Sequence, residues 1–203
     1  PADTDEFLIS DAGTLKRIDA SLVGGKDFAS LLSAGSGTAV SEIIFDNLDV
    51  STYSTFMIVW FSAPASDDQN LYAQIRTGGA SGSTYSSSYY DSTLFGVSAD
   101  NSYYSKLEGN ADHWRIQNNA GNGGSTEFHC SQIFFTPRKS SYQNYFGNFI
   151  RSQGTRYDSS TNFRGEFACG AFNHSDAPIA TGLRIYYASG NIEDYDYKLY
   201  GIV

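Results

Sequence analysis

The sequence predicts an all-β protein, an antiparallel β-sandwich of the jelly-roll or concanavalin-like kind, with a short N-terminal arm and helix. Aromatic residues make up 15% and charged residues 17% of the 203 residues, and the chain holds 20 glycines. This composition favours strands and turns over helices. Short runs with a period of two recur between Gly-rich or polar turns, which is typical of sandwiches and jelly rolls. A chain of this length can bury one large β-domain core.

Residues 1–32 are predicted to form an N-terminal arm with a short amphipathic helix. The first residues are polar, and Asp11 is a suitable cap for a helix in which Leu15, Ile18 and Leu22 share one face. Such a helix is too short to be stable alone. We therefore expect it to dock on its own domain or on a neighbouring subunit.

Residues 33–203 are predicted to form the sandwich. Trp60 and Trp114 fall on alternating apolar faces and are expected in its core. The run 55–63 is apolar on both faces, so its outer face is covered by the N-terminal segment or another protomer, or the run is an ordinary central strand. The expected strands are 42–47, 55–63, 70–76, 112–118, 127–136, 142–152, 163–172, 182–187 and 192–203.

The C-terminal segment has the clearest strand pattern. Leu183, Ile185 and Tyr187 alternate with more polar neighbours, and residues 188–191, Ala-Ser-Gly-Asn, then supply turn chemistry. Residues 192–203 continue with a period of two to the last residue. The sequence predicts a β-hairpin here that closes a sheet.

Three stretches resemble bacteriophage virion proteins. The segment IATGLRIYYASGNIEDYDYKLYGIV (179–203) resembles the end of the C-terminal β-sandwich domain of phage tail-fibre proteins, in its Gly-Leu-Arg strand, Ser-Gly-Asn-Ile turn and terminal LYGI. SEIIFDNLDVSTYSTFMIVWFSAPA (41–65) is similar to the same family, and TDEFLISDAGTLKRIDASLV (4–23) resembles a segment that precedes such domains. The resemblance implies a virion structural protein, made in the host cytoplasm, typically trimeric, and joined to other virion proteins through its N-terminal segment.

The net charge and the lack of long apolar runs argue against several classes of partner. The net charge of −9 and the pI of about 4.6 disfavour nucleic acid and anionic membranes. No apolar run approaches the roughly 20 residues of a spanning helix, so membrane insertion is not expected. The chain opens Pro1-Ala2-Asp3 without a secretory leader, which suggests a processed form or part of a longer chain.

The two cysteines, Cys130 and Cys169, lie in strand-like runs beside phenylalanine. We expect both to be buried free thiols, because cysteine is among the residues most often buried. A disulfide between them is the alternative.

Catalytic, metal and cofactor sites are not indicated. The histidines, His113, His129 and His174, lack the close spacing of a zinc site. His129 and Cys130 are strand neighbours, so their side chains point to opposite faces and cannot form a dyad. A glycosidase would need a pair of carboxylates, and four lie near the tyrosine-rich loops: Asp91, Asp100, Glu108 and Asp112. Three more lie near the C-terminus but lack the spacing of a calcium loop: Glu193, Asp194 and Asp196.

A ligand site is predicted in the region 77–110, which is rich in Gly, Ser and Tyr. These residues are common in adaptable binding loops, and aromatic rings beside short polar side chains suit sugars. Two loops come together if the strands between them pair as a hairpin; otherwise the tyrosines are strand formers on a surface. The candidate residues are Tyr89, Tyr90, Asp91, Asp100, Asn101, Tyr103 and Tyr104.

Two functions follow from the sequence. The first is a tail-fibre head, not an enzyme, that binds a host surface receptor, either a glycan or a protein. The second is a capsid decoration or other virion assembly protein. A polysaccharide-degrading enzyme is a less favoured third.

Overall fold

A computed structural model describes residues 6–11, 14–19, 28–121, 127–138, 147–158, 162–172 and 178–203. The chain divides into two compact units, 1–30 and 31–203. The first unit contains two antiparallel strands, β1 (Glu6–Asp11) and β2 (Thr14–Asp19), paired from Glu6 opposite Asp19 to Asp11 opposite Thr14.

The predicted N-terminal helix is wrong. Leu15 and Ile18 lie in strand β2, and Leu22 lies outside the described residues. The sequence places Gly13 between the two strands, and glycine favours hairpin connections and disfavours helices. The apolar run Phe7-Leu8-Ile9 before this turn is also a strand signal, which the helical spacing of Leu15 and Ile18 obscured.

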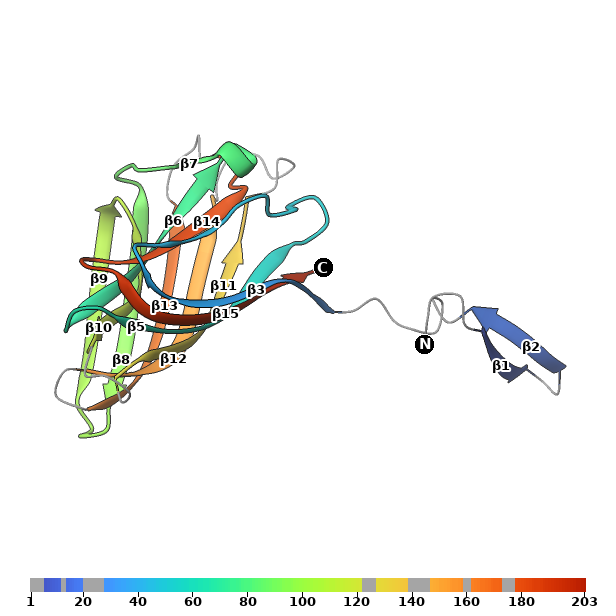
Figure 1. Ribbon diagram of the computed structural model, residues 1–203, viewed down its shortest axis with the longest axis horizontal. Helices are drawn as coiled ribbons and strands as arrows, with labels where there is room; N and C mark the ends of the chain where they lie inside the picture. Colours follow the sequence, from blue (N-terminus) through green and yellow to red (C-terminus); the bar gives the residue numbers. More distant parts are fainter. Residues whose placement is uncertain are drawn as a thin grey trace. The chain divides into compact units, whose positions relative to one another are not determined.

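The second unit consists of β-strands and one 3₁₀ turn in the part of the chain that the structure describes. The strands belong to two antiparallel sheets (Figure 1), so the all-β prediction is confirmed. The elements are β3 (Ala29–Val40), β4 (Ile43–Phe45), β5 (Thr55–Pro64), β6 (Gln69–Thr77), η1 (Gly79–Ser81), β7 (Ser83–Thr84), β8 (Tyr90–Ser98), β9 (Tyr103–Ala111), β10 (Trp114–Ala120), β11 (His129–Thr136), β12 (Phe149–Tyr157), β13 (Phe163–Phe172), β14 (Gly182–Tyr187) and β15 (Ile192–Ile202).

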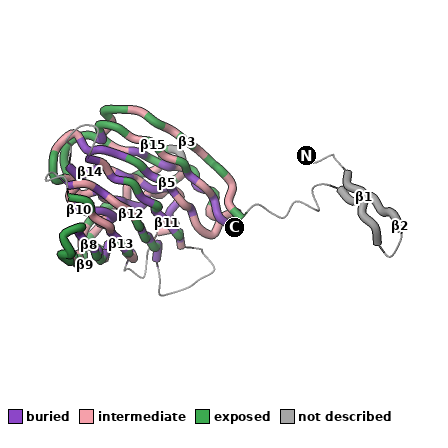
Figure 2. Tube along the Cα trace, turned by 90° about the horizontal axis from the view of Figure 1, so that it is seen from below, coloured by how far each residue is buried: buried purple, intermediate pink, exposed green. Residues whose placement is uncertain are grey.

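The larger sheet has eight strands in the order β3-β15-β5-β11-β12-β13-β8-β9. The smaller sheet has the order β10-β6-β14-β4, with β7 paired to β6. Both sheets contribute side chains to one buried cluster, including Phe56 and Trp60 from β5 and Leu71, Ile75 and Trp114 from the smaller sheet. Along the strands, buried and exposed residues alternate (Figure 2), as expected where one sheet face is covered.

The two tryptophans lie in this core, as predicted, and both are fully buried. The indole of Trp60 donates to Ser62 Oγ at 2.8 Å. Trp114 of β10 donates to the backbone oxygen of Ala171 in β13 at 3.0 Å, so this hydrogen bond joins the two sheets. Each indole N–H has a partner inside the core, which avoids the cost of an unsatisfied donor.

The C-terminal strands alternate as predicted, but they do not form a hairpin. Leu183, Ile185 and Tyr187 are buried. Strand β14 pairs with β4 and β6 in the smaller sheet, whereas β15 pairs with β5 in the larger one. The connection, with Gly190 at φ 75°, therefore crosses between sheets. A period of two shows which residues face the core, but it does not choose the sheet that a strand joins.

Strand β5 has an apolar outer face that is partly exposed. Phe56, Ile58 and Trp60 face the core, while Val59 and Phe61 on the other side retain 38% and 37% exposure. The double apolar run is therefore not explained by burial on both sides within the described residues. Instead, it marks an apolar surface on the larger sheet.

Candidate binding site

The strands between the two tyrosine-rich loops pair as a hairpin, but this hairpin keeps the loops apart. Strand β8 pairs with β9 so that Tyr90 lies opposite Ala111 and Val97 lies opposite Tyr103. Val97 is seven residue steps along the strand from Tyr90, a distance of about 23 Å at roughly 3.3 Å per residue. The two loops therefore do not come together.

Two of the predicted tyrosines are not available to a ligand. Tyr90 is fully buried, and its hydroxyl donates to the Tyr85 backbone oxygen at 2.5 Å and accepts from Ile75 N at 3.2 Å. Tyr104 is half-buried, and its hydroxyl donates to Glu166. Both side chains point toward the smaller sheet, because they occupy the inward positions of their strands.

The remaining predicted residues are exposed or half-buried, at opposite ends of the hairpin. Asp100 accepts from Ser102 Oγ at 2.7 Å and from Ser102 N at 3.0 Å, and these hydrogen bonds lower its pKa. Asn101 has a left-handed φ of 64°. Both therefore serve the turn. Tyr103 is 71% exposed next to Phe95, while Tyr89 and Asp91 lie at the far end of β8, where Asp91 accepts from Asn110 N at 2.9 Å.

Strand β13 points two of its three phenylalanines outward. Phe163, Phe167 and Cys169 are exposed, while Glu166 and Phe172 face the core. Other strands of the larger sheet also expose apolar residues, so this face is apolar over much of its width. Its large exposed members are Val59, Phe61, Phe95, Val97, Tyr103, Leu107, Phe149, Phe163 and Phe167.

Strand register places these outward residues in rows across the sheet. Cys169 lies opposite Arg151 of β12 and Thr93 of β8, and the row continues to Phe134 of β11 and Leu107 of β9. The neighbouring row contains Thr136, Phe149, Ala171 and Asp91.

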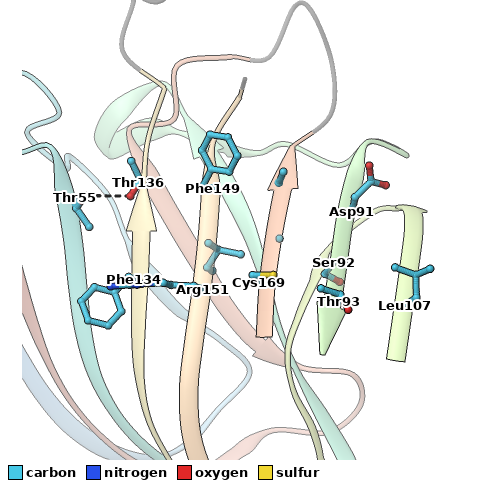
Figure 3. A pocket seen from close by; sticks show the side chains of 13 residues that line it. Thr55, Asp91, Ser92, Thr93, Leu107, Phe134, Thr136, Phe149, Arg151 and Cys169 are labelled. Atoms are coloured by element: carbon cyan, nitrogen blue, oxygen red, sulfur yellow. Dashed lines mark hydrogen bonds between the residues drawn. The ribbon is translucent and has the colours of Figure 1, made fainter. Parts of the chain in front are cut away.

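A hollow of about 580 Å³ lies over these two rows (Figure 3). Its floor contains the small residues Cys169, Gly170 and Ala171 of β13, while Phe149 on one side and Leu107 on the other stand higher. The hollow therefore follows from the segment FACGAF, in which small residues separate two phenylalanines. Phe134, Arg151 and Thr136 complete one wall, and Thr136 is hydrogen-bonded to Thr55 at 3.1 Å.

A second hollow of about 530 Å³ lies two residues further along the same strands. Phe95, Gln153 and Phe167 are among its lining residues, with Gly165 below them. A side chain added at Gly165 would meet no atom within 4 Å, so the glycine leaves the floor open. We call the two hollows together the outer groove; they are lined mainly by outward residues of β8, β12 and β13.

The outer groove has polar groups at fixed positions. Gln153 donates to Gln132 Oε1 at 3.1 Å, which orients both amides on the exposed face. The guanidinium of Arg151 lies 4.3 Å from the ring centroid of Phe134, within the range of a cation–π contact. The groove can therefore pack against an apolar ligand face and also hydrogen-bond to its polar edge.

Two of the predicted carboxylates belong to a separate cluster. Glu108 forms ion pairs with Arg115 and, at 3.5 Å, with His113, and Asp112 Oδ1 lies 2.6 Å from His113 Nδ1. Burial alone would lower the pKa of His113, but its two carboxylate partners raise it. The same contacts hold the pKa of Glu108 low. This arrangement favours the charged forms of both Glu108 and His113.

The cysteines are free, as predicted, but the prediction that they are buried is wrong. Cys130 and Cys169 are both exposed on the outer face of the larger sheet. They lie on β11 and β13, with β12 between them, opposite Thr155 and Arg151 respectively. This offset is about 13 Å along the strands and about 10 Å across them, too far for a disulfide.

Metal ligands are not clustered in the described ranges, where no group of three or more His, Cys, Asp or Glu side chains could hold an ion. Glu193, Asp194 and Asp196 are exposed on β15. His129 is fully buried, and burial together with the nearby charge of Arg156 lowers its pKa to about 3. His174 lies outside the described residues.

Sequence reasoning missed the outer groove because it expected the cysteines in the phenylalanine-containing strands to be buried. A signal was present in the paired strands, where Arg156 and Glu166 occupy the faces opposite to Phe149 and Phe167. Charged residues of opposite sign at such positions can be buried as a pair. In that case, the aromatic face is the outer one.

No helix among the residues that the structure places is long and apolar enough to cross a membrane. Searches against protein-family models, curated proteins and solved structures found no match to this chain. The functional argument therefore depends on the chain's own residues and on the geometry of the outer groove.

Proposed function

We propose that this protein is the receptor-binding head of a phage tail fibre and that it binds a host surface glycan in the outer groove. In this proposal the two antiparallel sheets form a sandwich of the jelly-roll kind, and the protein lies at the surface of the virion. The observation that carries the proposal is the groove itself, with exposed phenylalanines on paired strands and a floor of small residues.

The chemistry of the groove suits a saccharide. Sugar rings have C–H faces that pack on aromatic side chains, here Phe149 in one hollow and Phe95 and Phe167 in the other. Sugar hydroxyls need nearby donors and acceptors, which Gln153, Thr93 and other polar side chains of the groove provide. Because these groups lie on paired strands, little conformational entropy is lost when a ligand binds.

The positions of the carboxylates near the groove are consistent with binding without catalysis. Hydrolysis of a glycosidic bond commonly requires two carboxyl groups on either side of the bond. Asp91 lines the first hollow and Glu166 the second. Glu166 is held in a buried ion pair with Arg156 at 2.7 Å, so it supports the strands instead of supplying a proton.

A second candidate function, assembly of the virion as a capsid decoration or other structural protein, is favoured by strand β3. This strand is the last in its sheet, and its residues Leu31 and Leu32 are 57% and 39% exposed. An exposed edge with apolar side chains can pair with another chain. We propose that the protein forms a homotrimer through this edge and that the N-terminal segment contacts other virion proteins. The molar mass measured by light scattering should then be three times 22.2 kDa.

Filling the groove tests the binding function. The variant Cys169→Phe places a large ring on the floor of the first hollow, while the core is untouched because this side chain points outward. We expect it to weaken binding on a glycan array and on host cells by roughly 10-fold or more, an effect of about 1.4 kcal/mol. Cys130→Phe adds the same ring on the same sheet face, outside both hollows.

The control should bind like the unmodified protein. Equal binding by the Cys169→Phe and Cys130→Phe variants would contradict the groove as the site. If neither variant binds less but both assemble poorly into particles, the assembly function is favoured instead.

A further inference from the structure

The arginine in the first hollow differs from five other arginines of the chain. Arg76, Arg115, Arg156, Arg164 and Arg184 each form an ion pair with a carboxylate. Within the described ranges Arg151 forms no such pair, and its guanidinium stacks on the ring of Phe134 instead. In a chain with a net charge of −9, carboxylates are plentiful, so an arginine without one is unusual.

The position of Arg151 gives it access to a ligand. Its side chain is exposed and lines the first hollow, in the same row as Cys169 and Thr93. Stacking on Phe134 uses one face of the guanidinium and restricts its rotation, while the N–H groups around its edge remain able to donate. A guanidinium edge matches a carboxylate with two parallel hydrogen bonds.

The carboxylate on the opposite side of the hollow is already engaged. Asp91 accepts a hydrogen bond from Asn110 N at 2.9 Å, and it lies on β8, separated from β12 by β13. The strand spacing alone puts the backbones of Asp91 and Arg151 about 10 Å apart. The hollow therefore presents a cation on one side, an acceptor on the other, and an apolar floor between them.

From this arrangement we infer that the outer groove selects an acidic saccharide, one whose ring carries a carboxylate that Arg151 binds. This inference rests on the proposed function and names its ligand class. The sugar ring lies over the floor formed by Cys169 and Ala171, with its carboxylate toward Arg151 and its hydroxyls toward Asp91 and Thr93. A neutral sugar would leave the guanidinium without an anionic partner.

Matched acidic and neutral glycans provide the test. The full chain is applied to an array that carries uronic-acid and sialic-acid saccharides beside the same saccharides with each carboxylate reduced to an alcohol. We expect binding to the acidic members, with a loss of at least roughly 10-fold for their reduced counterparts, as for the loss of a charge-assisted hydrogen bond.

Variants then assign the effect to Arg151. Arg151→Gln should bind acidic and reduced saccharides equally weakly, and Arg151→Lys should retain part of the preference because it keeps the charge but loses the planar fork. The matched control is Lys198→Gln, which removes one positive charge from the same sheet face, on β15 opposite Val59, and should leave the preference unchanged.

The outcomes separate this inference from the proposed function. Binding of neutral saccharides alone, or acidic binding that Arg151→Gln does not change, would overturn the acidic ligand but leave the glycan-binding function intact. Binding to no saccharide of either kind would overturn both. Displacement of a bound acidic saccharide by laurate, an apolar carboxylate, at lower concentration than by the free sugar would also overturn the saccharide assignment.

Discussion

Arg156 of β12 and Glu166 of β13 form an ion pair inside the core, with Nε and Oε1 2.7 Å apart and side chains only 2% and 1% exposed. The pair also hydrogen-bonds to the backbone of strand β10, in the part where its pairing with β6 is irregular and the register shifts twice. Glu166 Oε2 accepts from Asn118 N at 3.0 Å, and Arg156 donates to the backbone oxygen of Asn119. Backbone groups that lack a strand partner thus bind to side chains of the other sheet.

Removing one charge of this pair should strongly destabilise the fold. We expect Glu166→Gln to lower the free energy of unfolding by about 3–5 kcal/mol, because Arg156 is left buried without a counter-charge. Urea titration measures this change. The exposed Glu193→Gln is the control and should change stability by less than about 0.5 kcal/mol.

The double variant Arg156→Met with Glu166→Leu should be more stable than either single charge deletion, because no unpaired charge remains. A loss below about 1 kcal/mol for Glu166→Gln would mean that water reaches the pair.

His129 should make the fold less stable as the pH falls. It is fully buried between Tyr187 and the backbone oxygen of Asn118, and its pKa is lowered from 6.5 to about 3. Between these values the unfolded chain binds a proton that the folded chain does not, so the free energy of unfolding decreases toward low pH by up to about 1.4 kcal/mol per pH unit.

The variant His129→Gln isolates this effect. Urea titrations from pH 7 to pH 5 should show that the unmodified protein loses about 2 kcal/mol more than the variant over this range. His113 has the opposite sign: its raised pKa adds stability below about 6.5 that is lost as pH rises through its folded-state pKa. It is present in both proteins and cancels in the difference. Parallel curves for the two proteins would show that His129 is not buried as a neutral ring.

Tyr90 should contribute to stability and not to ligand binding. Its hydroxyl bonds to Tyr85 and Ile75 inside the core, so Tyr90→Phe leaves two buried backbone groups without this partner, at a cost of about 1–3 kcal/mol. Tyr103 is 71% exposed, and Tyr103→Phe should change stability by less than about 0.5 kcal/mol. Denaturant unfolding compares the two. Equal stability of both variants would contradict the burial of Tyr90.

These residues show how far the sequence could predict the structure. Alternation correctly placed Leu183, Ile185 and Trp114 in the core, because burial of one sheet face imposes a period of two. It could not assign Tyr90, since an aromatic residue with a hydroxyl suits both a surface loop and a core that offers it hydrogen-bond partners. That distinction depends on Tyr85 and Ile75, which only the folded chain brings to the hydroxyl.

The candidate site was less predictable than the fold. One site from both tyrosine-rich loops requires the loops to meet, but hairpin pairing fixes them at opposite ends of β8 and β9. The outer groove depends on which face of β13 is buried, and a shift of one residue exchanges the two faces. Here the pairing of Arg156 with Glu166 is satisfied only when Phe167 points outward.

The two cysteines provide a direct measurement of that outward face. Both thiols are exposed, so in the native protein both should react with a thiol reagent, giving two labelled cysteines per chain without denaturant. Burial of either side chain would limit native labelling to one thiol, with the second reacting only after unfolding. The single-cysteine variants Cys130→Ser and Cys169→Ser allow each rate to be followed separately.

Because Cys169 lines the first hollow and Cys130 lines neither, a saturating glycan should slow labelling of Cys169 by roughly 10-fold and leave Cys130 unchanged. Equal protection of both thiols would indicate that the ligand, or a second copy of the chain, covers the whole sheet face, and protection of neither would place the ligand outside the outer groove.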